Sequence, residues 1–342
     1  MIEFLKIENT DFNLFDKSDD NAKYFYHFQG WADFLMKVGY EIEIYVIKKD
    51  KELLGNFFIE YHRRRFTKYG YIPAGFNIIK DLSKVEESEI YASFSEFLQK
   101  KVKEKKVRSL RFDYFGKIDL DNTNYDISLA VGLPKYSWEI DLTQDLETLR
   151  HQMSNSTRHN INKCEKNELI TVKKADTSKQ LAEFYNLMSD TTKRKGFINF
   201  NIDYFNQQFS SLKGNLCDLY ICYYNHTPIS AAWINYGSDT VFYTHGASTS
   251  EKELSKLRSP YLLQWKIIVE AKERGFKKYN MWGVLPDYLD NSDLPLKGVS
   301  EFKKSFGGDY LNSRGVFEVY SGFFGRVLTR LYDWWLYRGD RY

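Results

Sequence analysis

The stretch CDLYICYYNHTPISAAWINYGSDTVFYTHG, residues 217–246, decides the fold of this chain. Aromatic, β-branched and small apolar residues fill three runs within it, at residues 217–224, 229–236 and 240–244. Residues of this kind favour strands, whereas the Asn, Pro, Gly, Ser and Asp between the runs favour turns. The stretch therefore predicts three strands joined by short turns, with a hairpin turn at residues 237–239.

A helix and a fourth strand follow these three strands. The helix is predicted over residues 260–274, with Gly275 as its C-terminal cap, and the strand over residues 277–282. Hairpin strands, a helix and a strand that returns beside them form a mixed-sheet α/β module. Two further helices, over residues 181–188 and 204–212, are expected before this module.

The first part of the chain repeats this order of elements. A helix around residues 31–38 precedes strands at 41–48 and 54–61, a strand ending in 69–75, a helix at 87–105 and a strand at 107–113. The apolar residues of the second helix recur at helical spacing: Ile90, Phe94, Phe97, Leu98 and Val102. Two copies of one plan predict two related domains, at residues 1–140 together with 315–342, and at residues 141–314.

The segments between and after the two copies have patterns of their own. A strand at residues 138–142 and a polar helix over 145–167 are expected between them. The chain ends with a strand at 316–320 and an aromatic helix, whose apolar stripe comprises Phe323, Phe324, Val327, Leu328, Leu331, Trp334 and Trp335. We expect this stripe to pack against the first domain, and attachment to a membrane surface is the alternative.

The composition is that of a globular protein without a strong charge bias. Hydrophobic residues make up 43% of the chain, charged residues make up 28%, and the formal net charge is +3. This charge excludes a strongly basic nucleic-acid coat protein, so any contact with nucleic acid is local. Three basic clusters, at residues 62–68, 101–106 and 158–166, are interpreted as solvated faces.

Signals for export, membrane spanning and metal binding are missing from the sequence. The first 20 residues hold no apolar run of signal-peptide length, and no later run approaches a membrane span. The three cysteines, Cys164, Cys217 and Cys222, lack the spacing of metal ligands. We therefore expect a cytoplasmic protein with reduced thiols, no metal and, under the alternative for its last helix, a peripheral place at the membrane.

The common catalytic signatures are also missing. The sequence holds no nucleophile elbow, no phosphate-binding P-loop, no zinc-binding HExxH and no dinucleotide fingerprint after a predicted strand. His245 stands at a predicted strand end and is interpreted as a structural residue. Hydrolases, kinases and metalloenzymes are therefore disfavoured.

Several motifs occur together and in one order along the chain. The second half contains LLQW at 262–265, AKERG at 271–275, YNMWG at 279–283 and GVSEFKKSFGG at 298–308. Upstream stand QGW at 29–31, YIP at 71–73, WEIDL at 138–142 and TKRKGF at 192–197. In combination they resemble the FemABX peptidoglycan aminoacyltransferases across nearly the whole chain. The resemblance implies two tandem GNAT-like α/β domains, and the lack of sustained heptads is typical of the compact members without a coiled-coil arm.

The resemblance also implies a reaction. The family transfers an amino acid from aminoacyl-tRNA to the side-chain amine at position three of a peptidoglycan precursor peptide, in UDP-MurNAc-pentapeptide or lipid II, and so builds the interpeptide bridge. An aminoacyl ester is already activated, so the protein has to align the amine and stabilise an oxyanion, without a covalent nucleophile. No cofactor is implied besides the aminoacyl-tRNA, which is a co-substrate.

Functional residues follow from the same resemblance, residue by residue. Lys303, with Phe302 beside it, matches the family lysine that stabilises the tetrahedral intermediate. Lys37 and Arg194 resemble the residues that contact the precursor's phosphates, and Tyr71, Tyr243 and Trp31 are expected to bind the acceptor. Asp113 is expected either to meet an incoming ammonium or to form structural hydrogen bonds at the end of its strand.

Two departures from the family pattern fall in the first domain. The sequence has Ala74-Gly75-Phe76 where the family has Arg-Gly-Pro, and Tyr114 where the family has proline. We therefore place any change of substrate choice in this domain.

Two other functions stay open. One is an N-acyltransferase of GNAT type that uses an acyl-thioester, although residues 255–262 lack the glycine-rich turn that holds the pyrophosphate of coenzyme A. The other is a non-catalytic peripheral protein that binds membranes through residues 323–335.

Overall fold

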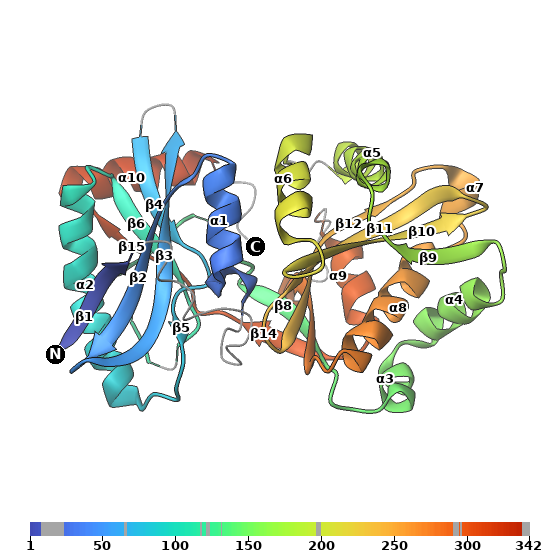
Figure 1. The fold of residues 1–342 in the computed structure, drawn as a ribbon, viewed down its shortest axis with the longest axis horizontal. Helices are drawn as coiled ribbons and strands as arrows, with labels where there is room; N and C mark the ends of the chain where they lie inside the picture. The colour runs from blue at the N-terminus through green and yellow to red at the C-terminus, as the bar shows by residue number, and fades with distance from the viewer. Residues whose placement is uncertain are drawn as a thin grey trace. The chain divides into compact units, whose positions relative to one another are not determined.

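The computed structural model describes residues 1–7, 24–64, 67–116, 118–120, 124–130, 132–195, 200–289, 294 and 296–336 (Figure 1). The chain divides into two compact units, and each is built around one mixed sheet. Unit 1 comprises Met1–Lys135 and Asn312–Tyr342, and unit 2 comprises Tyr136–Leu311. The predicted α/β fold with two mixed sheets is confirmed. Among the described residues, no helix has the length and hydropathy needed to cross a bilayer.

The sheet of unit 1 follows the predicted strand pattern and adds strands at both edges. Its order is β1 (Ile2–Ile7), β2 (Glu41–Lys49), β3 (Glu52–Arg64), β4 (Thr67–Ile72), β6 (Ser109–Tyr114), β15 (Gly315–Tyr320) and β7 (Asp126–Ile127), with β5 (Asn77–Ile78) paired to β3. Strands β4 and β6 run parallel, and the other neighbours are antiparallel. Helices α1 (Gln29–Lys37) and α2 (Lys84–Glu104) complete the predicted elements.

The sheet of unit 2 has the same arrangement. Its order is β14 (Asp309–Asn312), β8 (Tyr136–Asp141), β13 (Lys278–Gly283), β12 (Thr240–Ser248), β11 (Thr227–Tyr236), β10 (Cys217–Tyr224) and β9 (Ile170–Lys174). Strands β12 and β13 run parallel, and the long helix α8 (Ser259–Glu273) lies between them in the chain. The other helices of unit 2 are α3 (Leu146–Gln152), α4 (Asn155–Glu165), α5 (Ser178–Lys195), α6 (Ile202–Leu212), α7 (Lys252–Ser255) and α9 (Lys297–Lys304).

The two units share one strand plan. The order β1, β2, β3, β4, α2, β6 in unit 1 corresponds to β9, β10, β11, β12, α8, β13 in unit 2. The strand beside β6 is β15, which comes from the end of the chain, whereas the strand beside β13 is β8, which precedes its unit's other elements. Because β8 pairs with β13, unit 2 begins at Tyr136, five residues before the start expected from the sequence.

One predicted helix is broken. The polar helix expected over 145–167 is two helices, α3 and α4, because Met153 is extended with ψ 150°. Ser154 then begins α4 as its N-cap, since its hydroxyl accepts a hydrogen bond from the backbone N–H of Thr157 at 3.2 Å. A capping serine in the middle of a polar run was the available signal for this break.

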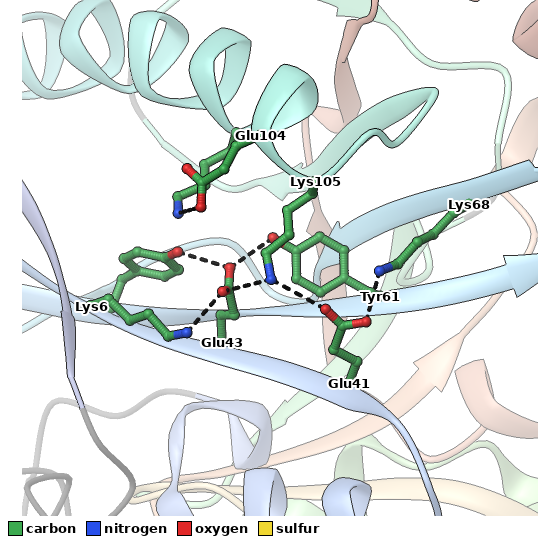
Figure 2. A network of polar contacts seen from close by, with 9 residues as sticks. Lys6, Glu41, Glu43, Tyr61, Lys68, Glu104 and Lys105 are labelled. Carbon is green, nitrogen blue, oxygen red and sulfur yellow. Dashed lines mark hydrogen bonds and ion pairs between the residues drawn. The ribbon is translucent and has the colours of Figure 1, made fainter.

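A buried carboxylate joins three strands and the end of a helix in unit 1 (Figure 2). Glu43 on β2 accepts hydrogen bonds from Lys6 on β1, from Tyr45, from Tyr61 on β3, and forms an ion pair with Lys105 at the end of α2. Burial alone raises its pKa, but these four partners outweigh burial and lower the pKa from 4.5 to about 2.

The same region pairs one lysine of the first basic cluster and two lysines of the second with carboxylates. Lys68 and Lys105 both pair with Glu41, at 2.7 Å and 3.2 Å, and Lys101 pairs with Glu104 (Figure 2). Lys68, Lys101 and Lys105 are therefore already paired with carboxylates within the fold.

The last helix, α10 (Phe323–Leu336), packs in a way that the sequence did not predict. Apolar and polar residues alternate along strand β6. Leu110, Phe112 and Tyr114 point into the core that α2 covers, and the polar residues between them point to the opposite face of the sheet. On that face Arg111 forms buried ion pairs with Glu318 on β15 at 3.0 Å and with Asp333 on α10 at 3.1 Å. Helix α10 therefore packs its polar side on the sheet.

The expectation that the apolar stripe of α10 packs against the first domain is wrong. All seven of its members are exposed: Phe323, Phe324, Val327, Leu328, Leu331, Trp334 and Trp335. Gly325, Thr329 and Asp333 are the buried residues of the helix. The reason is physical, since a buried arginine needs its carboxylates, and the helix side that carries Asp333 is the side opposite the stripe.

We predict that Arg111→Met destabilises the chain strongly. The substitution leaves Glu318 and Asp333 buried without their cation, which costs about 3–5 kcal/mol of unfolding free energy. Lys256→Met is the control, because its pair with Glu253 is exposed and contributes little. Urea unfolding followed by circular dichroism measures both. An unchanged midpoint for Arg111→Met would show that the two carboxylates do not need the guanidinium.

We predict that Glu43→Gln changes the pH dependence of stability. The folded pKa of Glu43, about 2, lies below its ordinary value of 4.5, so its stabilisation is complete above that value and is lost as the pH falls toward 2. The deficit of Glu43→Gln relative to wild type should therefore narrow between about pH 5 and pH 3. Glu89→Gln, which removes a carboxylate from an exposed ion pair, is the control.

Candidate functional site

The parallel strands of unit 2 separate part of the way along their length. Strand β12 pairs with β13 only from Thr240 to Phe242, although β12 continues to Ser248 and β13 to Gly283. Beyond this point the two strands no longer satisfy each other's backbone groups. Ligands of open α/β sheets bind at the carboxyl ends of the strands. The point of separation is therefore the candidate functional site.

Local irregularities in both strands produce the separation. On β12 the register with β11 shifts, so that Thr244 is an extra residue between Tyr243 and His245. On β13, Trp282 has φ 67° and its N–H donates to the side chain of Asn280 at 2.8 Å. A left-handed backbone is strained for a residue as bulky as tryptophan, and such strain is concentrated at functional sites.

Lys303 lies at this point. Its Nζ donates a hydrogen bond to the carbonyl oxygen of Gly283, the last residue of β13, at 2.7 Å. The same Nζ lies 5.9 Å from the centre of the Tyr243 ring on β12, so the lysine touches both strands where they diverge. The residue is only 8% exposed, and burial lowers its pKa from 10.5 to about 7.

The charge of Lys303 is not neutralised nearby. No carboxylate among the described residues pairs with it, and one hydrogen bond to a carbonyl uses one of its three donors. A buried cation without a counter-ion is costly, and groups with strongly shifted pKa values gather at functional sites. The arrangement is suited to stabilising a negative charge that develops beside β12 and β13.

Helix α9 fixes the position of Lys303. Ser300 lies three residues earlier on the helix, and its hydroxyl accepts from the N–H of Leu285 at 2.8 Å. That hydroxyl also donates to the carbonyl of Leu296 at 3.0 Å. Residues three apart share a helix face, so Ser300 ties the face that carries Lys303 to the segment after β13.

The two aromatic residues of β12 beside the site have different surroundings. Tyr243 is half-buried, and burial raises the pKa of its hydroxyl. Gly246 leaves room for this ring, since a Cβ there would lie 1.7 Å from the Tyr243 hydroxyl oxygen. His245 packs against Phe205 at 5.3 Å, and burial lowers its pKa to about 4. His245 is therefore neutral near pH 7.

Two other predicted residues of unit 2 lie elsewhere. Phe302 turns into the core, where its ring lies 5.0 Å from Tyr261 and 5.2 Å from Phe306. Arg194, near the end of α5, is exposed and donates long hydrogen bonds to the carbonyls of Ser248 and Thr249 at 3.4 Å and 3.3 Å. Arg194 thus stands at the far end of β12, whereas Lys303 and Tyr243 are neighbours.

Unit 1 has a saturated carboxylate at the end of its own parallel strand pair. Asp113 follows the end of the β4–β6 pairing and accepts hydrogen bonds from the Tyr71 hydroxyl at 2.6 Å, the Ala74 N–H at 2.8 Å and the Leu133 N–H at 3.0 Å. Burial raises its pKa to about 6, against the effect of these donors. Three donors from two loops and a strand give Asp113 the geometry of a structural anchor.

Both departures from the family pattern belong to this anchor or to the core. Ala74 and Gly75 have φ 58° and 64°, and a Cβ on Gly75 would lie 2.5 Å from the Asp113 carbonyl oxygen. Tyr114 is buried, and its hydroxyl donates to Glu87 at 3.0 Å. The two departures therefore have structural roles in unit 1.

The remaining predicted residues lie on α1. Trp31 is buried against Phe25 and Phe34, with ring centres 4.6 Å and 5.3 Å away. Lys37 is exposed as the last residue of the helix. Six residues of helix rotate the two side chains to different sides, so α1 does not bring them together. Within the described part of the chain, no three His, Cys, Asp or Glu side chains are placed to hold a metal ion.

Comparison with known proteins gives a family and a fold. The sequence profile of the FemAB family matches residues 119–227 and 214–322. Aminoacyltransferase FemA of Staphylococcus epidermidis is 31% identical over 94 residues, which are 27% of this chain and 21% of FemA. The match thus spans about a fifth of that relative's length.

Two solved structures resemble the whole fold. The crystal structure of FemX has a TM-score of 0.78 at 17% identity, covering 97% of this chain and all of that one. A tandem GNAT protein from the clavulanic acid biosynthesis pathway has a TM-score of 0.56 at 7% identity, covering 94% of this chain and 99% of its own. These likenesses confirm the tandem GNAT-like fold. Since the profile matches most of the chain, including the segment that carries Lys303, the chain belongs to the FemAB family.

Proposed function

We propose that this chain is a tRNA-dependent aminoacyltransferase of peptidoglycan synthesis. It moves an amino acid from aminoacyl-tRNA to the side-chain amine at position three of a precursor stem peptide and so builds the interpeptide bridge. Family membership and the similarity to FemA support this activity. The observation that carries the proposal is the buried, unneutralised ammonium of Lys303 where β12 and β13 separate.

The proposed step needs charge stabilisation and alignment. The acceptor amine attacks the ester carbonyl, a C–N bond forms, and the C–O bond to the ribose of the tRNA breaks. The amine loses a proton, and the leaving ribose oxygen gains one. A negative charge develops on the carbonyl oxygen in between, and the ammonium of Lys303 lies in a water-poor site where its attraction is strong.

Substrate contacts are proposed for residues of both units. Arg194 is proposed to bind phosphate of the precursor, because its long hydrogen bonds to carbonyls are readily exchanged for a bidentate contact with phosphate oxygens. Lys37 is proposed as a second phosphate contact, and Tyr243 as a contact of the acceptor peptide. The precursor is UDP-MurNAc-pentapeptide or lipid II, and no cofactor is needed besides aminoacyl-tRNA.

We predict that Lys303→Met lowers transfer by at least about 100-fold, because it removes the cation that meets the oxyanion. The assay follows radiolabelled amino acids from a mixed aminoacyl-tRNA pool to UDP-MurNAc-pentapeptide and to its lipid-linked form. Lys304→Met is the matched control, since the neighbouring lysine pairs with the exposed Asp287 instead. It should keep transfer within about twofold of wild type.

Variations of this assay test the identity of the acyl donor separately from the identity of the acceptor. Loss of transfer after RNase treatment is expected for a tRNA-bound donor. Transfer that survives RNase and is supported by an acyl-thioester would replace the proposed donor while leaving the fold intact. No transfer to either acceptor by the wild-type chain would overturn the peptidoglycan assignment.

We predict that Lys303→Met stays folded and gains stability at low pH relative to wild type. The folded pKa of Lys303, about 7, lies below its ordinary value of 10.5, so the unfolded chain binds more protons between these values. Wild-type stability should therefore rise with pH through this window, and the advantage of Lys303→Met at pH 6 should shrink toward pH 10. Thermal unfolding of both proteins across this pH range measures the difference, with Lys304→Met as the reference for the loss of a lysine that is paired with a carboxylate.

A further inference from the structure

Helix α10 presents its apolar side to the outside of unit 1. Phe324 is 80% exposed and Trp335 is 57% exposed, figures that are high for side chains of this size. We call the set the α10 apolar face, and it comprises Phe323, Phe324, Val327, Leu328, Leu331, Trp334 and Trp335. Seven large apolar side chains on one side of a helix form a patch of the kind that marks an interaction surface.

The buried side of the helix keeps this face outward. Gly325 lets the helix approach closely, since a Cβ there would lie 2.3 Å from the Ser321 hydroxyl oxygen and 3.4 Å from the Arg108 carbonyl oxygen. Two turns further on, Asp333 forms its buried ion pair with Arg111. Rolling the helix to bury its apolar side would pull Asp333 away from the guanidinium. The fold therefore keeps the α10 apolar face exposed to solvent.

The edge strand β7 lies beside the helix. Arg330 donates a hydrogen bond from Nη1 to the carbonyl oxygen of Ile127 at 3.1 Å, and Arg326 forms an ion pair with Asp126 on the same strand. Ile127 pairs with Phe317, so its side chain belongs to the face of the sheet that α2 covers, and the apolar face is formed by α10 itself.

The helix itself carries more positive than negative charge. It has two arginines, Arg326 and Arg330, of which Arg326 pairs with Asp126 on β7, and its one acidic residue, Asp333, is buried in an ion pair. The last 20 residues of the sequence hold four arginines and two aspartates. A helix with phenylalanine, leucine and tryptophan on one side and arginine at its flanks has the chemistry of helices that lie in the headgroup region of anionic bilayers.

We propose that the α10 apolar face docks this protein on an anionic lipid bilayer, with the helix lying in the plane of the interface. The apolar side chains enter the boundary of the acyl region, and Arg326 and Arg330 face lipid phosphates. This attachment goes beyond the proposed transfer reaction and does not depend on it.

A bilayer fits this face because it needs no complementary protein surface: each apolar side chain that enters it contributes separately.

Vesicle sedimentation of the full chain tests the proposal. Wild type should sediment with vesicles that contain phosphatidylglycerol and less with vesicles of phosphatidylcholine alone. The variant Leu328→Glu with Leu331→Glu should reduce partitioning onto the anionic vesicles by at least about tenfold. The matched control is Val85→Glu with Leu169→Glu, which adds the same charge at exposed apolar positions outside the face and should bind like wild type.

The other outcomes overturn the proposal. Equal sedimentation of the α10 variant and wild type would place any lipid contact elsewhere. Failure of wild type to sediment, together with concentration-dependent self-association that the α10 variant abolishes, would make a second copy the occupant. Failure of both would leave the face without a lipid partner. Thermal unfolding of the variants checks folding, and no loss is expected because the substituted side chains are exposed.

Discussion

The parallel pairing of β12 with β13 stops at Phe242 and Asn280, and the candidate site depends on this interruption. If the pairing continued, backbone hydrogen bonds would join the strands, and no side chain from α9 could reach between their ends. The bulge on β12 and the left-handed Trp282 on β13 hold the strands apart. The ammonium of Lys303 lies where these two distortions leave the sheet incomplete.

Unit 1 is built on the same strand plan but carries a different charged group at the end of its parallel strand pair. In unit 1 the position after the β4–β6 pairing holds Asp113, and three donors use its carboxylate. In unit 2 the residue after the β12–β13 pairing is Met281, and the charged group near the separation is Lys303 of α9, with a single hydrogen bond to a carbonyl. The carboxylate of Asp113 in unit 1 thus accepts three hydrogen bonds, whereas the ammonium of Lys303 in unit 2 donates one. Two units with one strand plan therefore differ in the polar groups at the ends of their parallel strands.

Sequence reasoning recovered what local pattern determines. Alternation and turn residues predict the strand meanders of both units, which the structure confirms, and the motif at residues 298–308 predicts a role for Lys303 that stays a prediction. Edge strands β1 and β9 were missed because charged residues interrupt their alternation, and exposed edges tolerate such residues. The bulge at Thr244 and the saturation of Asp113 depend on partners distant in sequence, so no local pattern contains them.

Helix α10 shows most clearly what the apolar periodicity of a helix cannot predict, namely which side of the helix packs on the sheet. A helical pattern shows that one side is apolar, and the usual inference is that this side faces the core. Here Arg111 on the sheet is buried with Glu318, and Asp333 completes its ion pairing from the helix. Leaving such a charge unpaired costs several kcal/mol, about as much as burying two large apolar side chains contributes. This ion pair joins Arg111 and Asp333, which are 222 residues apart in the sequence. It therefore helps to determine how α10 is oriented on the sheet, and the apolar side of the helix is left for a partner outside the chain.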